Sequence, residues 1–337
     1  MKLDTMLPPA ALGDVPMLAR AAEDLGFDGL WAAETSHDPY LPLALAAEHT
    51  SRVELGTSIA VAFPRSPLVH AQIAWDLQAQ SKGRFILGLG TQVKGHNERR
   101  FGIPWHAPGP RLREMILAIR AIWDCWQNGT RPSFEGERYR FTLMTPFFNP
   151  GPIAHPSIPI YIAGVNTYMC RLAGELCDGF HVHPFHSIRY LREHLLPEVD
   201  EGLAKGGRRR SDLTLSSSAF VITGATPAEI ERARDAVRMQ LAFYASTRAY
   251  VRVLETHGWG DAGTRLTEKA AKGDWAGMAR EITDEMLDVF AVTAPHDEIA
   301  AKVRAKYDGM LDRVAFYVPF QAGADIDRWK RIIAAFH

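Results

Sequence analysis

The chain alternates short apolar runs with segments in which apolar residues recur every three to four positions. Short apolar runs are typical of buried strands, and the second spacing is typical of amphipathic helices. Strands that alternate with helices form parallel sheets, because each helix returns the chain across the sheet. The apolar runs lie at residues 3–7, 29–32, 54–58, 85–90, 160–163, 179–182, 214–221 and 314–319. Eight strands interleaved with helices predict an α/β fold, a (β/α)8 TIM barrel rather than a doubly wound sheet.

Several helices carry boundary signals in the sequence. Ser66, Pro67 and Gly83 have the order of a cap, a first helical position and a stop, which predicts a helix between them. Thr226 and Glu229 have the spacing of a capping box at the start of a long helix. The clearest helical pattern carries its apolar residues on one face, and these residues are Leu112, Met115, Ile116, Ile119, Ile122, Trp123 and Trp126.

Three segments depart from the strand–helix alternation. A polar loop covers about residues 92–110, and a mostly helical insertion covers 257–290. A stretch rich in Pro, Gly and aromatic residues covers 130–157, where we expect a hairpin and a loop. Large α/β barrels routinely exceed roughly 250 residues as single domains. We therefore expect one barrel domain over residues 1–337 with these three insertions.

Composition excludes several classes of protein. The chain has 38 Lys and Arg residues against 39 Asp and Glu residues, and this balance argues against binding of nucleic acid or of an anionic membrane surface. No apolar stretch approaches the roughly 20 residues of a membrane span, and Asp4 stands where a signal peptide would be apolar. The cysteines, Cys125, Cys170 and Cys177, lack the spacing of a redox or zinc motif. We expect a cytoplasmic protein.

In a barrel of this kind, chemistry is carried by the residues at the carboxyl ends of the strands. Glu34 and His37 follow the second strand, and His37 beside Asp38 is a candidate acid or base, or else a structural part of the start of the next helix. Gly88 and Gly90 end the fourth strand, where missing side chains would leave room for a flat ligand.

The fifth strand passes into a helix through Gly164, Val165 and Asn166. The backbone N–H groups at a helix N-terminus bind phosphate readily, so this turn is a candidate phosphate site, or alternatively a tight turn without a ligand. The spacing of Gly88 and Gly90 does not match a dinucleotide-binding fingerprint, and no ATP-binding loop of the Walker type is present.

Histidines gather at the end of the sixth strand, at positions 181, 183 and 186. Alternation along a strand would place His181 and His183 on one face, where they could hold a polar substrate or pair structurally. Because no Asp or Glu accompanies them at the ends of strands seven and eight, we expect no metal. His181, His183 and Phe320, which ends the eighth strand, are the candidate substrate-binding residues.

The chain resembles the luciferase-like monooxygenase superfamily over nearly its whole length, and within it the branch of oxidoreductases that depend on the deazaflavin coenzyme F420. The similarity is carried by four motifs in barrel order, which are Leu25-Gly26-Phe27-Asp28-Gly29-Leu30-Trp31 with His37 beyond it, Leu55-Gly56-Thr57-Ser58-Ile59, Gly83-Arg84-Phe85-Ile86-Leu87-Gly88-Leu89-Gly90-Thr91, and Pro159-Ile160-Tyr161-Ile162-Ala163-Gly164.

The resemblance implies specific roles at the strand ends. A cis peptide between Ser58 and Ile59, followed by Ala60, would form a bulge against the centre of the deazaflavin ring. Thr91, Gln92 and Val93 would lie at the edge of the ring, and Gly164, Val165 and Asn166 would bind the cofactor phosphate. His37 would be the first candidate for proton transfer and Glu34 the second.

One departure from the family bears on the substrate. Sugar-phosphate dehydrogenases of this branch have Gly-Glu after the strand-four Thr, with the Glu serving as an acid, whereas Gln92 and Val93 stand there in this chain. Val93 cannot transfer a proton, so a sugar phosphate is disfavoured as the substrate.

We expect a homodimeric F420-dependent oxidoreductase that transfers a hydride between the cofactor and a small organic molecule. Three alternatives stay open. One is an FMN-dependent monooxygenase on the same fold, the second is a metal-dependent hydrolase that uses the three histidines, and the third is a binding barrel that has lost the chemistry.

Overall fold

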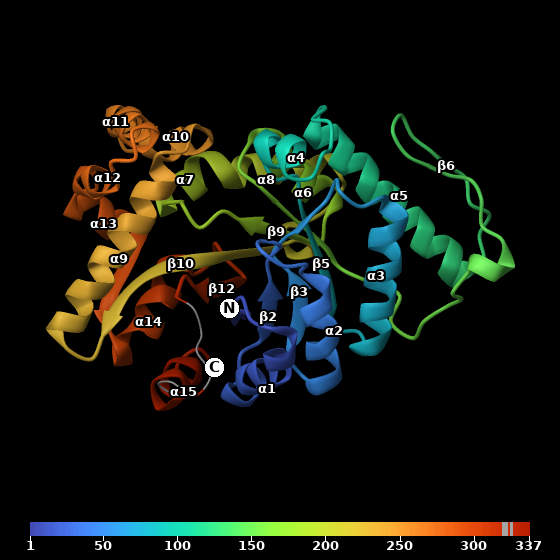
Figure 1. The fold of residues 1–337 in the computed structure, drawn as a ribbon, viewed down its shortest axis with the longest axis horizontal. Coiled ribbons are helices and arrows are strands. Elements are labelled where there is room, and N and C mark those ends of the chain that lie inside the picture. The colour runs from blue at the N-terminus through green and yellow to red at the C-terminus, as the bar shows by residue number, and fades with distance from the viewer. Residues whose placement is uncertain (319–322, 324–325) are drawn as a thin grey trace. The chain divides into compact units, whose positions relative to one another are not determined.

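The protein is an α/β barrel of parallel strands surrounded by helices, as the alternating pattern predicts (Figure 1). The computed structural model describes residues 1–318, 323 and 326–337. The barrel strands, in their order around the sheet, are β1 (Lys2–Met6), β2 (Gly29–Ala32), β3 (Glu54–Thr57), β5 (Phe85–Gly90), β8 (Ile160–Gly164), β9 (Gly179–Val182), β10 (Thr214–Gly224) and β12 (Arg313–Phe316). Each of the eight predicted apolar runs forms one of these strands, although residue 319 of the last run lies outside the described residues.

Two short strands join the sheet without belonging to the predicted eight. β4 (Ala60–Val61) pairs with β5, and β11 (Ala291–Pro295) runs parallel to β10. The sequence analysis missed β11 because it follows a helix directly and ends in a proline. A separate antiparallel hairpin of β6 (Phe134–Glu135) and β7 (Arg140–Phe141) confirms the hairpin expected within residues 130–157.

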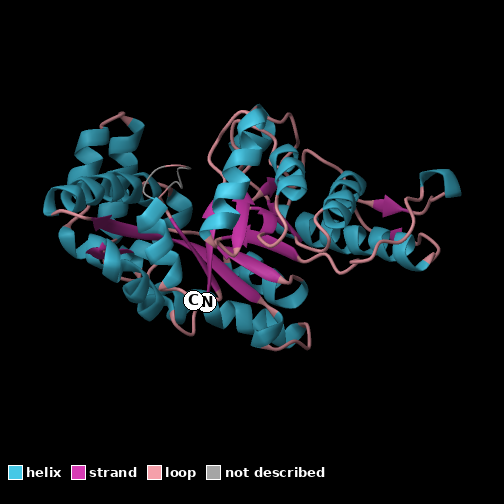
Figure 2. Cartoon of the chain, turned by 90° about the horizontal axis from the view of Figure 1, so that it is seen from below, coloured by secondary structure: helices cyan, strands magenta, loops and turns pink. Residues whose placement is uncertain are grey.

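The chain divides into two compact units, which are described separately. The first unit comprises residues 5–181 and 199–214, and the second comprises residues 1–4, 182–198 and 215–337. Figure 2 shows the helices in cyan lying against the strands in magenta. Among the described residues, no helix combines the length and the apolar character that a membrane span requires.

The helices of the first unit follow its strands. They are α1 (Val15–Leu25), α2 (Tyr40–His49), α3 (Pro67–Gln80), α4 (Lys94–Arg99), α5 (Pro108–Asn128) and α6 (Thr167–Leu176), and most of α8 (Leu196–Lys205) also belongs here. Ser66 caps α3 as predicted, because its hydroxyl accepts from the Val69 N–H at 3.3 Å. The whole predicted apolar face of α5 is buried, and Trp123 Nε1 donates to the Ala71 carbonyl of α3 at 3.1 Å.

Large rings and glycines complement each other inside the first unit. A Cβ on Gly56 would lie 2.3 Å from the Trp31 ring, and a Cβ on Gly179 would lie 2.4 Å from the Tyr161 ring. Trp31 also meets the His181 ring edge-on at 4.9 Å between centroids. Because interiors are close-packed, the glycines on some strands are required by the rings on their neighbours.

The second unit carries most of the helices of the C-terminal half. They are α7 (Ile188–Tyr190), α9 (Pro227–Ala245), α10 (Val251–Glu255), α11 (Gly260–Ala271), α12 (Trp275–Glu281), α13 (Asp284–Phe290), α14 (His296–Tyr307) and α15 (Ile326–Ala334). Helices α9 to α13 bury an apolar cluster that includes Leu241, Leu254, Leu266 and Phe290. β1 and β12 are joined by a buried ion pair, in which Arg313 binds Asp4 through two contacts of 2.8 Å. Thr226 caps α9 as predicted, whereas the Glu229 carboxylate accepts from the Ala225 N–H and not from the cap itself.

Candidate active site at the carboxyl ends of the strands

The chain forms a bulge directly after β3. Gly56 is level with Ile86 in the β3–β5 pairing, and Ala60 is level with Leu89 in the β4–β5 pairing, so three residues of one chain segment oppose two of the other. The Ser58–Ile59 peptide bond inside this bulge is cis, which confirms the geometry that the resemblance implies. Its place beside a cofactor stays a prediction.

The Thr57 hydroxyl closes the hydrogen bonding that the bulge opens. It accepts from the Gly88 N–H at 2.8 Å and donates to the Gly88 carbonyl at 2.7 Å. A Cβ on Gly88 would lie 1.7 Å from the Thr57 carbonyl oxygen, and a Cβ on Gly90 would lie 2.7 Å from the Ile59 side chain. The expectation that these glycines leave room for a ligand is therefore corrected, since that space holds Thr57 and Ile59.

Glu34 holds the segment that follows the bulge. Its backbone N–H donates to the Ile59 carbonyl at 3.1 Å, and its carboxylate accepts from the Val61 N–H at 2.7 Å. The Glu34 side chain is only 6% exposed. Both ends of this one residue thus bind backbone groups on the far side of the Ser58–Ile59 bond, which suits a residue that positions the bulge.

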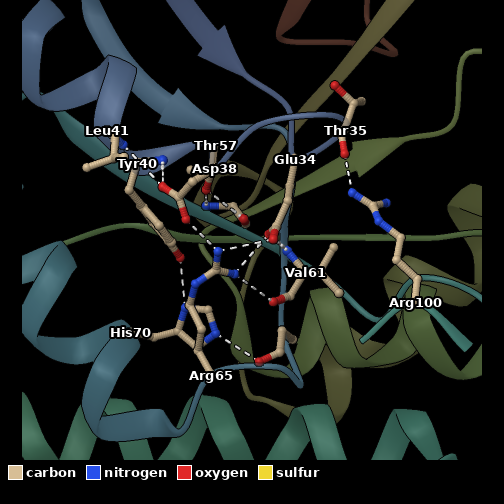
Figure 3. A network of polar contacts seen from close by, with 12 residues as sticks. Glu34, Thr35, Asp38, Tyr40, Leu41, Thr57, Val61, Arg65, His70 and Arg100 are labelled. Carbon is tan, nitrogen blue, oxygen red and sulfur yellow. Dashed lines mark hydrogen bonds and ion pairs between the residues drawn. The ribbon is translucent and has the colours of Figure 1, made fainter. Parts of the chain in front are cut away.

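Arg65 joins Glu34 to Asp38 in a buried charge network (Figure 3). Its guanidinium binds both carboxylate oxygens of Glu34, at 2.9 and 3.1 Å, and Asp38 Oδ2 at 2.6 Å. Burial alone would lower the pKa of Arg65, but the hydrogen bonds to Glu34 and Asp38 outweigh burial and raise it. A fork that binds two carboxylates in this way holds both of them in fixed positions.

A neutral pair lies beside the network in Figure 3. The Tyr40 hydroxyl donates to His70 Nδ1 at 2.7 Å, because His70 Nε2 carries the proton that binds the Ala62 carbonyl at 2.8 Å. Burial lowers the pKa of His70 to about 4 and raises the pKa of Tyr40. Both side chains are therefore uncharged at neutral pH, and they tie α2 and α3 to the residues after β4.

His37 is exposed on the loop between β2 and α2. Its alternative role at the start of the helix belongs to its neighbour, since Asp38 Oδ1 accepts from the N–H groups of Tyr40 and Leu41, the first residues of α2. Among the described residues, the His37 ring has no hydrogen-bond partner. An exposed imidazole next to a fixed carboxylate is suited to proton transfer, and this role stays a prediction.

The turn after β5, the fourth predicted strand, is shaped by Asn97, which is fully buried. Its amide donates to the Thr91 carbonyl at 2.9 Å and to the Val93 carbonyl at 3.1 Å. Gln92 between them has a φ of 56°, which is rare for a residue other than glycine, and its side chain accepts from the Val93 N–H at 3.0 Å. The three predicted ring-edge residues therefore form one fixed turn.

β8, the fifth predicted strand, leads into α6 through the predicted phosphate site. Asn166 caps this helix, since Oδ1 accepts from the Met169 N–H at 3.0 Å. A Cβ on Gly164 would lie 2.3 Å from Met169 Cβ. The need for glycine at position 164 is thus explained by the packing of α6 against its own strand, and phosphate binding by Gly164, Val165 and Asn166 stays a prediction.

The three predicted histidines lie in β9 and in the segment directly after it. His181 belongs to the first unit, where its ring packs on Trp31 and Tyr161. His183 and His186 belong to the second unit, and His186 Nδ1 donates to the His183 carbonyl at 2.7 Å. In the part of the chain that the structure describes, no group of three His, Cys, Asp or Glu side chains could hold a metal ion. Phe320 lies outside the described residues.

Sequence reasoning missed four residues that shape this site, Arg65, Tyr40, His70 and Asn97. Arg65 follows the third strand in an otherwise apolar stretch, which was its only signal. Tyr40 and His70 stand within helical patterns and give no sign of their partnership. Asn97 follows β5, in a segment where the sequence indicates only a polar loop.

An α/β barrel that gathers buried polar side chains at its strand ends is an enzyme scaffold. The sequence pattern described as "Luciferase-like monooxygenase" matches residues 2–313, so the chain belongs to the luciferase-like monooxygenase family. It is 50% identical over 314 residues to a Mycobacterium tuberculosis protein described as uncharacterized, covering 93% of this chain and 92% of that protein.

Two further similarities concern proteins with described activities. The chain is 36% identical over 209 residues to an F420-dependent glucose-6-phosphate dehydrogenase of Intrasporangium calvum, covering 57% of this chain and 60% of the dehydrogenase. The solved structure of the coenzyme F420-dependent tetrahydromethanopterin reductase of Methanopyrus kandleri superposes with a TM-score of 0.78 at 22% identity, covering 98% of this chain and 96% of the reductase. The structural similarity confirms the fold.

Proposed function

We propose that the protein is an F420-dependent oxidoreductase that transfers a hydride between the deazaflavin and a small organic substrate. The observation that carries this proposal is the fixed bulge at residues 57–59, bracketed by Glu34, in a chain whose relatives include F420-dependent enzymes. A flat ring needs a rigid backbone wall, and the hydrogen bonds of Glu34 and Thr57 make this wall rigid.

The residues present fit the cofactor at two further places. The turn of Thr91, Gln92 and Val93 is held by Asn97 and offers a second fixed backbone edge. The start of α6 carries the partial positive charge of a helix N-terminus and a small residue before it, and these suit a phosphate. Ser58, Ile59 and Ala60 would face the ring, and Gly164, Val165 and Asn166 would hold the phosphate.

Bound F420 would supply or accept a hydride at a ring carbon, which is a two-electron reaction that needs no oxygen. The chain must then orient the substrate and move one proton. We assign the proton to His37, because its ring is exposed and next to the fixed Asp38. Glu34 is assigned to positioning, because its carboxylate is already bound by Val61 and Arg65. His181, His183 and Phe320 stay the proposed substrate-binding residues.

FMN is the alternative cofactor, since the same fold binds it in 3,6-diketocamphane monooxygenase. That enzyme class reacts with oxygen, so an oxygen electrode distinguishes the two functions. A metal-dependent hydrolase would require a metal in stoichiometric amount, which elemental analysis of the purified protein would detect.

The turnover experiment follows the oxidation of reduced F420 without oxygen, in the presence of a panel of enones, imines and ketones. We expect at least one acceptor to oxidise the reduced cofactor in a protein-dependent manner. Reduced F420 that stays reduced across the whole panel would favour the binding barrel. Oxygen uptake with reduced FMN would favour the monooxygenase.

We further propose that the protein is a homodimer, as the resemblance implies. Leu41, Leu68 and Val69, at the starts of α2 and α3, are exposed apolar side chains that a second copy could cover. Light scattering on the purified protein measures the mass, and a monomer at micromolar concentration would contradict this proposal.

A further inference from the structure

The second unit contains a group of polar-tipped rings that the assignments above do not use beyond His183. We call the four residues His183, Tyr244, Tyr250 and Tyr317 the tyrosine cluster. The His183 ring lies 4.2 Å from the Tyr250 ring and meets the Tyr244 ring edge-on at 4.9 Å between centroids. The hydroxyls of Tyr244 and Tyr317 are hydrogen-bonded to each other. All four residues are partly buried.

The elements that carry the tyrosine cluster belong to the functional end of a barrel. His183 directly follows β9, and Tyr317 directly follows β12. Tyr244 is in the last turn of α9, and Tyr250 precedes α10, both within the helical segment that follows β10. In (β/α)8 barrels, residues at the carboxyl ends of strands and in the segments after them bind substrates.

The His183 ring is a hydrogen-bond donor toward the other rings. Its Nδ1 accepts from the Phe185 N–H at 3.2 Å, so the proton of the neutral ring is on Nε2. Burial, and then the neighbouring His186, lower the pKa of His183 to about 3. The ring therefore carries no charge at neutral pH, and its remaining polar atom is an N–H group.

Tyr244 and Tyr250 are likewise neutral. Burial raises the pKa of Tyr244 and of Tyr250, and the other contributions come from neighbouring tyrosines. Among the described residues, no Lys, Arg, Asp or Glu contributes to the pKa shift of His183, Tyr244 or Tyr250. A charged ligand would lose its hydration here without meeting an opposite charge, which is costly.

Phenylalanine rings pack against the tyrosine cluster. Phe220 packs against Tyr317 at 4.9 Å between centroids, and Phe185 and Phe220 pack against Tyr244 at 6.5 and 6.2 Å. Aromatic rings favour a flat partner in stacked or edge-on contact, and a buried phenol or imidazole N–H requires an acceptor. The cluster thus favours a ligand that is flat and uncharged and that carries a hydrogen-bond acceptor.

We propose that the tyrosine cluster binds the substrate as a neutral, planar molecule whose carbonyl oxygen accepts hydrogen bonds from His183 Nε2–H and a tyrosine hydroxyl. Its identification as the substrate site rests on the proposed oxidoreductase function, whereas the binding preference itself does not. The proposal excludes a phosphorylated sugar as the preferred substrate, and it adds Tyr244, Tyr250 and Tyr317 to the specificity-determining residues.

The test compares two ligands that share a ring and differ in charge. 2-Acetonaphthone is a flat neutral ketone, and 2-naphthoate carries a carboxylate on the same ring. Isothermal titration calorimetry on the full chain without cofactor would measure both dissociation constants. We expect the ketone to bind at least roughly tenfold more tightly than the carboxylate, since one unpaired desolvated charge costs more than a tenfold factor. Equal binding, or tighter binding of the carboxylate, would overturn the proposal.

Variants locate the binding. His183→Phe keeps a ring and removes the N–H donor, and we expect it to weaken ketone binding roughly tenfold. Because this change also leaves the Phe185 N–H without its acceptor, Tyr250→Phe serves as a second variant that keeps the ring and the fold. Tyr139→Leu in the first unit is the matched control, and it should bind the ketone as the natural chain does. Unchanged binding in both cluster variants would contradict the proposal.

The same titration separates this inference from the proposed function. If F420 fails to bind while the ketone still binds the natural chain and loses affinity in the variants, the cluster is a ligand site and the oxidoreductase function is wrong. If F420 binds and reduced F420 is oxidised, but the cluster variants bind the ketone normally, the function stands and this substrate class is wrong.

Discussion

The two units hold their polar side chains in opposite ways. In the first unit, Arg65 binds Glu34 and Asp38 in a network of full charges, and the Glu34 carboxylate also binds backbone. In the second unit, the tyrosine cluster consists of one imidazole and three phenol rings and is held mainly by ring contacts. The first arrangement fixes one geometry, whereas the second allows a ring to shift by small amounts at low cost.

The proposed function gives a reason for this difference. A cofactor is the same in every turnover, and a charge network with fixed partners suits a wall against which it always lies in one position. A substrate must enter and leave, and half-buried neutral rings allow this without breaking an ion pair. The contrast predicts that changes in the charge network cost stability, and that changes in the tyrosine cluster cost ligand affinity.

The largest expected effect is that of Arg65→Leu. Removing the guanidinium leaves the buried Glu34 carboxylate without its charged partner and with the Val61 N–H as its remaining contact. Breaking a buried ion pair on one side costs about 3–5 kcal/mol of the free energy of unfolding. Urea unfolding followed by circular dichroism measures this change. The matched control is Arg171→Leu, which breaks the exposed pair with Glu201 and should cost at most about 1 kcal/mol. Similar costs for the two variants would contradict the structural role of the network.

The next effect concerns pH. The pKa of His70 is lowered to about 4 in the folded chain, against 6.5 for a histidine in an unfolded chain. Below about pH 6.5 the unfolded chain therefore binds more protons than the folded chain, and the free energy of unfolding falls with pH down to about pH 4. By pH 5 the loss is about 2 kcal/mol for this histidine.

His70→Gln should remove about that part of the pH dependence between pH 7 and pH 5, as measured by urea unfolding at each pH. His183 and His186, whose pKa values are lowered to about 3 and about 4, should contribute in the same direction from the second unit. A natural chain whose stability does not change over this interval would show that these rings are charged in the folded state.

The same change, tyrosine to phenylalanine, can be made in both units, and its cost in stability should differ between them. Tyr40→Phe leaves the buried His70 Nδ1 without a donor, which costs about 1–3 kcal/mol. Tyr244→Phe removes a hydroxyl from a half-buried pair that water can satisfy, so we expect a cost below about 1 kcal/mol. Thermal or urea unfolding of the two variants in parallel gives the answer. A larger loss from Tyr244→Phe would mean that the tyrosine cluster is a structural core.

The smallest effect on stability is expected from His37→Ala, within about 0.5 kcal/mol, because the ring is exposed and lacks partners among the described residues. Its effect on turnover should be large, about 100-fold or more, if the ring transfers the proton. Cofactor affinity should change little. A variant that binds the cofactor weakly and turns over normally once saturated would give His37 a binding role.

The eight barrel strands were predictable from the sequence because each contains its own apolar run between helical patterns. β11 was not, since its five residues follow α13 without a turn signal and their parallel partner β10 is remote in the chain. The cap of α3 was predictable because the Ser66 hydroxyl accepts from the Val69 N–H, only three residues away in the chain.

The side-chain partnerships of the site were beyond the sequence. Arg65 binds carboxylates 27 and 31 residues away, and Tyr244 binds a hydroxyl 73 residues away. Gly88 shows the same limit, because the sequence indicates a missing side chain and only the structure shows that Thr57 fills the space. Local patterns determine elements, whereas these contacts depend on which strand ends become neighbours.

We propose that this barrel binds F420 rather than FMN. A titration of the purified full chain with each cofactor, followed by the change in fluorescence of the cofactor, tests it most directly. We predict saturable binding of F420 and at least roughly tenfold weaker binding of FMN, which corresponds to about 1.4 kcal/mol. Tight binding of FMN together with no binding of F420 would contradict the account.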